Sequence, residues 1–233
     1  VLGAIDGKHI KIRKPANSGS LFYNYKGSFS TVLLGICDAN YRFLYYDIGS
    51  YGHVHDSRVL DNSSFGQGLR SGRFALPSPR QLSGCTMDIP YFFLGDGAFP
   101  LSEHLMKPFS GHTTQENATF NYRLSRGRRV IENAFGILAA RWRILLKDIE
   151  TSPDNADRIV RATVHLHNFL STEEPFSRAQ AERMEVSHLE STPVAPRNAH
   201  RSSNYAQLIR QQLVGYFQAE GAVSWQQESS QSY

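Results

Sequence analysis

Three acidic residues that lie in or beside apolar segments constrain this chain more than any other feature of its sequence. Asp6 stands within the run VLGAIDGKHIKI, Asp96 follows the run YFFL, and Glu132 belongs to the segment RRVIENAFGILAARWRIL. A carboxylate in the core of a strand costs free energy unless a partner compensates its charge. Three such acids in different elements suggest one shared compensator, a divalent cation held by carboxylate oxygens.

Hydrophobic patterning predicts an α/β fold. We expect strands at 1–12, 29–37 and 41–49, which form an antiparallel meander joined by short turns, and a short buried strand at 91–94. The proline-rich stretch 72–90 is expected to be a surface loop. Helices are expected near 54–60 with Asp56 and Ser57 as the cap, from about Pro100, over 121–146 and over 153–171. This order predicts a mixed sheet with helices covering its faces.

A change of composition near residue 171 suggests the domain organisation. Residues 1–171 are predicted to form one domain, whereas 172–233 are rich in Ser, Gln and Glu and are expected to be mostly disordered, with an amphipathic helix at 203–219. The first residue already lies in an apparent strand, so we interpret the sequence as a piece of a longer protein. The two cysteines lack metal or redox spacing, which favours a reduced, intracellular setting. The lack of a long uncharged apolar run argues against a membrane span.

The acids have a chemical interpretation in phosphodiester hydrolysis, which needs an activated water and a neutralised leaving oxygen. Two divalent ions supply both when carboxylates bridge and flank them. Asp6 and Asp96 lie side by side if their strands are neighbours, Glu132 closes the site, and Asp56 is a further oxygen ligand. The alternatives are a structural salt bridge for Asp6, a turn role for Asp96 and a surface ion pair with arginine for Glu132.

Two further groups of residues bear on function. His53 and His55 in GHVHDSR keep open a zinc hydrolase as a competing hypothesis. Basic residues flank the acids along the chain, and the formal net charge is +4. Such residues suit DNA phosphates, although a solvated basic helix face is an alternative interpretation. The predicted DNA contacts are Lys8, Lys11, Arg128, Arg129, Arg141 and Arg143.

Five ordered motifs together resemble the DDE-superfamily endonuclease domain of PIF/Harbinger transposases and of the nucleases derived from them. These motifs are GAIDGKHI, YDIGSYGHVHDSRVL, FFLGDGAFPLSEHLMKP, RRVIENAFGILAARWRIL and VHLHNFL. The resemblance covers residues 1 to about 171 and implies an RNase H-like fold with Mg²⁺- or Mn²⁺-dependent strand cleavage and transfer at transposon ends. It assigns Asp6, Asp96 and Glu132 as catalytic acids and metal ligands, and Asp56, in the HDS motif, as a further metal ligand.

The resemblance also implies partners and a location. Transposon-end DNA is the expected substrate, a Myb-like DNA-binding protein the expected partner, and a homo-oligomer is compatible with both. We expect a nuclear location, with the cytoplasm as the alternative when the partner is absent. A domesticated protein that binds DNA or a partner without transposition is the second hypothesis for function.

Overall fold

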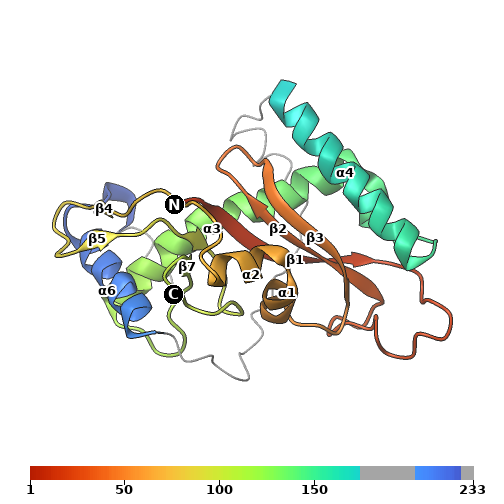
Figure 1. Cartoon of the computed structure of the whole chain (residues 1–233), viewed down its shortest axis with the longest axis horizontal. Helices are drawn as coiled ribbons and strands as arrows, with labels where there is room; N and C mark the ends of the chain where they lie inside the picture. Colours follow the sequence, from red (N-terminus) through yellow and green to blue (C-terminus); the bar gives the residue numbers. More distant parts are fainter. Residues whose placement is uncertain (174–202, 227–233) are drawn as a thin grey trace.

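The computed structural model describes residues 1–173 and 203–226, and its framework is a five-stranded sheet (Figure 1). β1 (Gly3–Lys11), β2 (Ser30–Cys37) and β3 (Phe43–Tyr51) form the predicted antiparallel meander. The turn between β2 and β3 is held by Asp38, whose carboxylate accepts from the backbone N–H groups of Asn40 and Arg42 at 2.8 and 3.0 Å. The meander therefore follows from local turn chemistry together with β-branched strands.

Two short parallel strands extend the sheet beyond β1. β6 (Phe93–Leu94) pairs with β1, and β7 (Leu105–Met106) pairs with β6, so the strand order is β3-β2-β1-β6-β7. The helix expected from about Pro100 is wrong, because backbone groups in this stretch pair with β6 instead. The N–H groups of Phe93 and Gly95 donate to the carbonyls of His104 and Met106.

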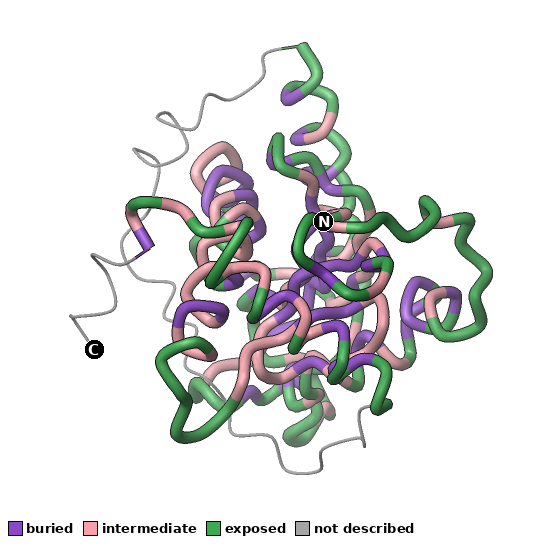
Figure 2. The backbone as a smooth tube through the Cα atoms, turned by 90° about the vertical axis from the view of Figure 1, so that its left-hand side faces the viewer, coloured by how far each residue is buried: buried purple, intermediate pink, exposed green. Residues whose placement is uncertain are grey.

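Helices cover both faces of the sheet, and the α/β mixed-sheet prediction is confirmed. The long α3 (Gln115–Arg141) and α4 (Pro153–Glu173) pack on one face with Ala4 and Leu33. The short α1 (Asp56–Asn62) and α2 (Ser64–Arg70) pack on the other with Ile5 and Leu34. β2 is buried along its whole length, as expected of a strand covered on both faces. The arrangement is consistent with an RNase H-like fold, and buried backbone concentrates in its interior (Figure 2).

Several element boundaries differ from the sequence expectation. α1 begins at Asp56 itself, and its N-cap residue His55 makes no side-chain capping bond, so the expected Asp56–Ser57 cap is wrong. α2 was not expected, and the 72–90 loop contains a small hairpin of β4 (Arg80–Gln81) and β5 (Asp88–Ile89). α3 ends at Arg141, after which a 3₁₀ turn, η1 (Arg143–Leu146), follows.

A C-terminal helix packs on the domain at the end of the molecule that also carries β4 and β5 (Figure 1). α6 (Asn204–Gln218) lies where the amphipathic helix was expected, and a 3₁₀ turn, η2 (Ser224–Gln226), follows it. Its buried residues Ile209 and Leu213 join the same core as α3. The segments expected to be disordered lie, apart from their ends, outside the described residues. Within the described ranges, no helix is both long and apolar enough to span a bilayer.

Candidate active site

Asp6 and Asp96 are brought together by the parallel pairing of β1 with β6. Ala4 stands opposite Leu94 in this pairing, and the aspartates follow two residues later, Asp6 on β1 and Asp96 just after the end of β6. The Asp96 carboxylate accepts the N–H of Ala98 at 2.9 Å, which fixes the turn that leaves β6. The turn role left open for Asp96 is therefore real, and it coexists with a position beside Asp6.

Asp56 approaches the same region from the opposite face of the sheet. Its carboxylate lies directly against Gly7, at the place where a β-carbon would stand on any other residue. A glycine at this position of β1 is therefore what gives the Asp56 carboxylate its room. Because Gly7 is the neighbour of Asp6 along the strand, the first residue of α1 comes close to the end of the site that β1 and β6 form.

Glu132 reaches the site through Arg128 rather than by touching an aspartate. Nη2 of Arg128 lies 3.1 Å from the Glu132 carboxylate and 3.9 Å from that of Asp6. The side chains of Arg128 and Asp6 are only 11% and 13% exposed, whereas that of Glu132 is 40% exposed. Gly127 sits against the Leu94 side chain of β6, so α3 passes close enough to the sheet for Arg128 to reach Asp6.

Burial and neighbouring carboxylates raise the pKa values of two of the aspartates, Asp6 and Asp56. Burial raises the pKa of Asp6 to about 7; the Arg128 guanidinium opposes this rise, and the charges of Asp96 and Asp56 add to it. Burial likewise raises the pKa of Asp56 to about 6, with Asp96 adding and Lys26 opposing. Without a further cation, the site therefore retains protons at a pH where ordinary carboxyls have lost them.

This donor set suits a hard divalent ion. All four acids offer oxygen, which Mg²⁺ and Mn²⁺ prefer, and a cation would offset the burial and the repulsion that raise the pKa values of Asp6 and Asp56. The Asp6 pKa is raised despite the nearby Arg128 guanidinium, so that charge compensates Asp6 incompletely, and the buried Nε of Arg128 has no hydrogen-bond partner. As the described side chains stand, no three His, Cys, Asp or Glu residues converge into a cluster that could hold a metal ion. Asp56 and Asp96 are near enough to Asp6 to raise its pKa, but the carboxylates do not converge as ligands, and Glu132 is linked to Asp6 only through Arg128.

The predicted DNA contacts differ in their surroundings. Lys8 is 8% exposed, with its ammonium 5.8 Å from the Phe135 ring centroid, and burial lowers its pKa to about 8, against the opposing charge of Asp6. Arg128 is engaged with two acids, and Arg141 is partly buried. The side chains that are exposed on the surface are those of Lys11, Arg129 and Arg143. Contact of any of these residues with DNA stays a prediction.

Sequence reasoning missed three cationic or aromatic neighbours of the acids. Lys107, just after β7, donates to the carbonyl of Gly97 at 3.0 Å. Burial lowers the pKa of Lys107, and the Asp96 charge opposes that change. Tyr25 and Lys26, in the loop between β1 and β2, lie in the field of the aspartates. An aromatic residue followed by lysine in an otherwise polar loop was the available signal for the last two. No local pattern marks Lys107, because only the β6–β7 pairing brings it to Asp96.

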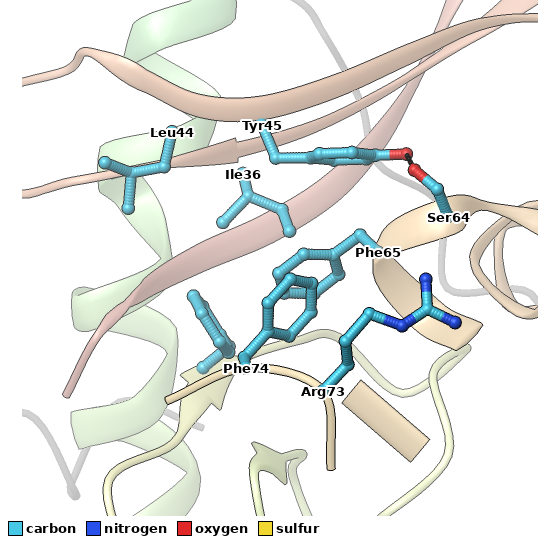
Figure 3. Close-up of a pocket in the computed structure, with 8 residues that line it drawn as sticks. Ile36, Leu44, Tyr45, Ser64, Phe65, Arg73 and Phe74 are labelled. Carbon is cyan, nitrogen blue, oxygen red and sulfur yellow. Dashed lines mark hydrogen bonds between the residues drawn. The ribbon is translucent and has the colours of Figure 1, made fainter. Parts of the chain in front are cut away.

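His53, one of the two histidines of the zinc hypothesis, contacts the loop between β1 and β2 and the end of β3. A ring nitrogen of His53 lies 2.6 Å from the carbonyl of Leu21, and its ring stacks on Tyr51 at 6.1 Å. A separate cavity of about 380 Å³ opens between α2 and the edge strand β3 (Figure 3). It is lined mainly by apolar and aromatic side chains, with Arg73 at its side, and Tyr45 is hydrogen-bonded to Ser64 at 3.0 Å within it. None of the four acids lines this cavity.

Comparison with known proteins agrees with this architecture. A family model described as DDE superfamily endonuclease matches residues 5–168. The Arabidopsis thaliana protein named "Protein ALP1-like" is 32% identical over 173 residues, which are 72% of this chain and 42% of the relative. The Homo sapiens protein named "Putative nuclease HARBI1" is 28% identical over 171 residues, which are 72% of this chain and 45% of the relative. The chain thus spans less than half the length of these relatives, and no solved structure matches it significantly.

The family resemblance predicted from the motifs is thereby confirmed. The matched region holds Asp6, Asp56, Asp96 and Glu132, together with all but the first two residues of the sheet, the whole of α3 and most of α4. Because the match extends over most of the sequence, the chain belongs to the DDE superfamily endonucleases.

Proposed function

We propose that this chain is the catalytic domain of a divalent-metal-dependent DNA endonuclease of the Harbinger transposase type, which cuts and joins strands at transposon ends. The observation that carries the proposal is the approach of Asp6, Asp56 and Asp96 from three separate elements to one end of the sheet, where the charge of Asp96 raises the pKa values of Asp6 and Asp56 and that of Asp56 adds to the rise for Asp6. Carboxyls with strongly raised pKa values concentrate at functional sites in proteins.

The residues have distinct roles in this proposal. Asp6, Asp56, Asp96 and Glu132 hold Mg²⁺ or Mn²⁺, which supplies the polarisation that activates a nucleophile and neutralises a leaving oxygen. Arg128 holds the Glu132 carboxylate at 3.1 Å and keeps it near Asp6. The exposed Lys11, Arg129 and Arg143 bind backbone phosphates of the DNA, and Lys8, Arg128 and Arg141 contribute positive charge from partly buried positions. A Myb-like protein, a nuclear location and a homo-oligomer remain part of the same proposal.

Cleavage by substituted proteins tests the proposal. Asp6→Asn, Asp96→Asn and Glu132→Gln should each lower Mn²⁺-dependent nicking of transposon-end DNA by more than about 100-fold, the upper range for residues that merely support metal ligands. Asp148→Asn, a change of the same type at an exposed residue, should leave nicking unaltered. The measurement is strand cleavage on denaturing gels, with folding checked by circular dichroism. A folded wild-type chain that leaves such DNA intact in both metals would sink the proposal.

A second candidate is a DNA- or partner-binding module that keeps the fold without transposition. The observation in its favour is that Glu132 is paired with Arg128 and that the described acids form no three-ligand cluster. This module would bind DNA equally well with and without the carboxylates of Asp6 and Asp96, and would not cut it. Binding and nicking measured on the same variants therefore separate the two candidates.

A further inference from the structure

The loop between β1 and β2 presents an aromatic and a basic side chain at a tightly constructed turn. Asn24, which is 3% exposed, accepts the backbone N–H groups of Lys26 and Ser28 on its amide oxygen at 3.0 and 3.1 Å. Its amide nitrogen donates to the Ser30 hydroxyl at 2.8 Å, which ties the turn to the first residue of β2. The turn is therefore rigid, while Tyr25 at its tip is 56% exposed.

This turn stands over the same face of β1 as Asp56. The Tyr25 ring packs edge-on against His9, with the centroids 5.4 Å apart. Residues two apart on a strand share a face, so His9 and Gly7 point the same way, and the Asp56 carboxylate lies against Gly7. Burial raises the pKa of the Tyr25 hydroxyl, and the charges of Asp56, Asp6 and Asp96 raise it further, so all three acids act on this residue.

Lys26 completes the arrangement. Its ammonium lies 5.6 Å from the centroid of the Tyr25 ring, and its charge lowers the pKa of Asp56. A cation next to an exposed aromatic face is the combination with which proteins hold a single nucleic-acid strand, because the ring stacks on a base and the cation meets a phosphate.

We propose that Tyr25 and Lys26 form a nucleotide-binding platform beside the acidic site, in which the Tyr25 ring stacks on an unpaired nucleobase and the Lys26 ammonium contacts the adjoining phosphate. The platform rests on the proposed function, since the strand it holds is the one presented to the acids. It holds that strand in place for cleavage and takes no part in the chemistry itself.

Binding of a fluorescent DNA tests the platform. The probe is a duplex with a short single-stranded gap that carries 2-aminopurine, and the full chain is mixed with it in Ca²⁺, which replaces the metals that support cleavage. Tyr25→Ala should weaken the affinity by roughly 5- to 100-fold, the range for loss of one base–aromatic stack, and abolish the quenching of the fluorophore. Tyr25→Phe keeps the ring and should behave like the wild type. Lys26→Gln should lower the slope of log affinity against log salt by about one.

Tyr23→Ala is the matched control, since Tyr23 lies on the same loop, is 47% exposed and packs on Phe29 instead of facing the acids. Affinity and quenching should be unaltered in this variant. If Tyr25→Ala binds and quenches like the wild type, or if Tyr25→Phe loses as much as Tyr25→Ala, base stacking is refuted, and nicking by the wild type would leave the proposed function standing. If the wild type neither binds nor nicks any DNA, the proposed function fails and the platform falls with it.

Discussion

Arg128 connects the acid on α3, Glu132, with the acid on β1, Asp6. Its guanidinium is 11% exposed and stands between Glu132 on its own helix and Asp6 on β1. A buried ion pair contributes little net stability, because desolvation offsets the attraction, but loss of one partner leaves a costly buried charge. The Asp6 carboxylate remains a costly buried charge even with its partner in place, since the Arg128 charge only partly opposes the rise of the Asp6 pKa. Under the proposed function, this pattern suits an additional cation more than it suits stability.

Gly7 is the residue whose replacement tests this arrangement most directly. The β-carbon of Gly7→Ala would occupy the space of the Asp56 carboxylate, which must then move away from β1. We expect Mn²⁺ affinity and nicking to fall by about 10- to 100-fold, the range found when support of a metal ligand is lost. Calorimetric titration of Mn²⁺ and the nicking rate are the measurements.

Gly97→Ala is the matched control for this change. Gly97 follows Asp96 directly, and a β-carbon there meets no atom within 4 Å. This variant should therefore bind Mn²⁺ and nick DNA like the wild type. Equal values for Gly7→Ala and the wild type would mean that the Asp56 position is not needed for metal binding.

At the scale of elements, α6 lies beyond the family match and yet belongs to the same core. Arg123 on α3 stands 4.5 Å from the Phe217 ring centroid and donates to the Gly221 carbonyl at 3.0 Å. Arg210 on α6 lies 3.8 Å from the Phe109 ring centroid and donates to the carbonyl of Lys107 at 3.5 Å. α6 therefore packs against the segment after β7, which carries Lys107, the lysine near Asp96.

Two leucines on α6 provide a matched test of this packing. Leu213 is 3% exposed, whereas Leu208 on the same helix is 48% exposed. Leu213→Ala should lower the free energy of unfolding by about 2–5 kcal/mol, because it leaves a cavity between α6 and α3. Leu208→Ala should change it by less than about 0.5 kcal/mol. Urea unfolding followed by circular dichroism measures both; equal midpoints for the two variants would show that α6 is only loosely attached.

The elements that the sequence predicted are those whose pattern is local. β1, β2 and β3 were found from β-branched runs and the Asp38 turn, and α3 and α4 from apolar residues at helical spacing. β7 was missed because Leu105 and Met106 are too few to show a period, and their strand exists only through pairing with β6. In the site, the acids were visible because a carboxylate in an apolar run is conspicuous. The pairing of Arg128 with both Asp6 and Glu132, and the place of Tyr25, depend on tertiary packing that no local pattern encodes.

At the scale of the whole molecule, the site joins the two faces of the sheet. Asp6 on β1 faces α3 and contacts Arg128, whereas Asp56 comes from α1 on the opposite face of the sheet. Asp96 follows β6, the strand paired with β1. Asp56 and Glu132 therefore lie on helices that pack in the two hydrophobic cores, whereas Asp6 lies on β1 and Asp96 follows β6. Folding brings these carboxylates together against their mutual repulsion, so stability and function compete in this chain, and a bound cation would favour both.

This competition predicts a dependence of stability on pH and metal. The carboxyl of Asp6 has a pKa near its ordinary value of 3.8 in the unfolded chain and of about 7 in the folded one. Between these values the folded state alone holds the proton, so stability of the metal-free protein should fall as pH rises, by at most about 1.4 kcal/mol per pH unit for this group. Asp6→Asn removes the group, so the melting temperature of this variant in EDTA should rise relative to that of the wild type as the pH increases from 4 to 7.

Mn²⁺ should reverse this loss, since it binds the deprotonated carboxylates of the folded state. At a hundredfold excess over its dissociation constant an ion stabilises the fold by about 2.7 kcal/mol, which raises the melting temperature of a domain this size by roughly 5–10 °C. The rise should be larger at pH 8 than at pH 5, where protons compete for Asp6 and Asp56, and it should vanish in Asp6→Asn but persist in Asp148→Asn. Differential scanning fluorimetry in EDTA and in Mn²⁺ measures it. An equal Mn²⁺ effect in Asp6→Asn and wild type would place the ion away from these acids and leave their crowding without a ligand to explain it.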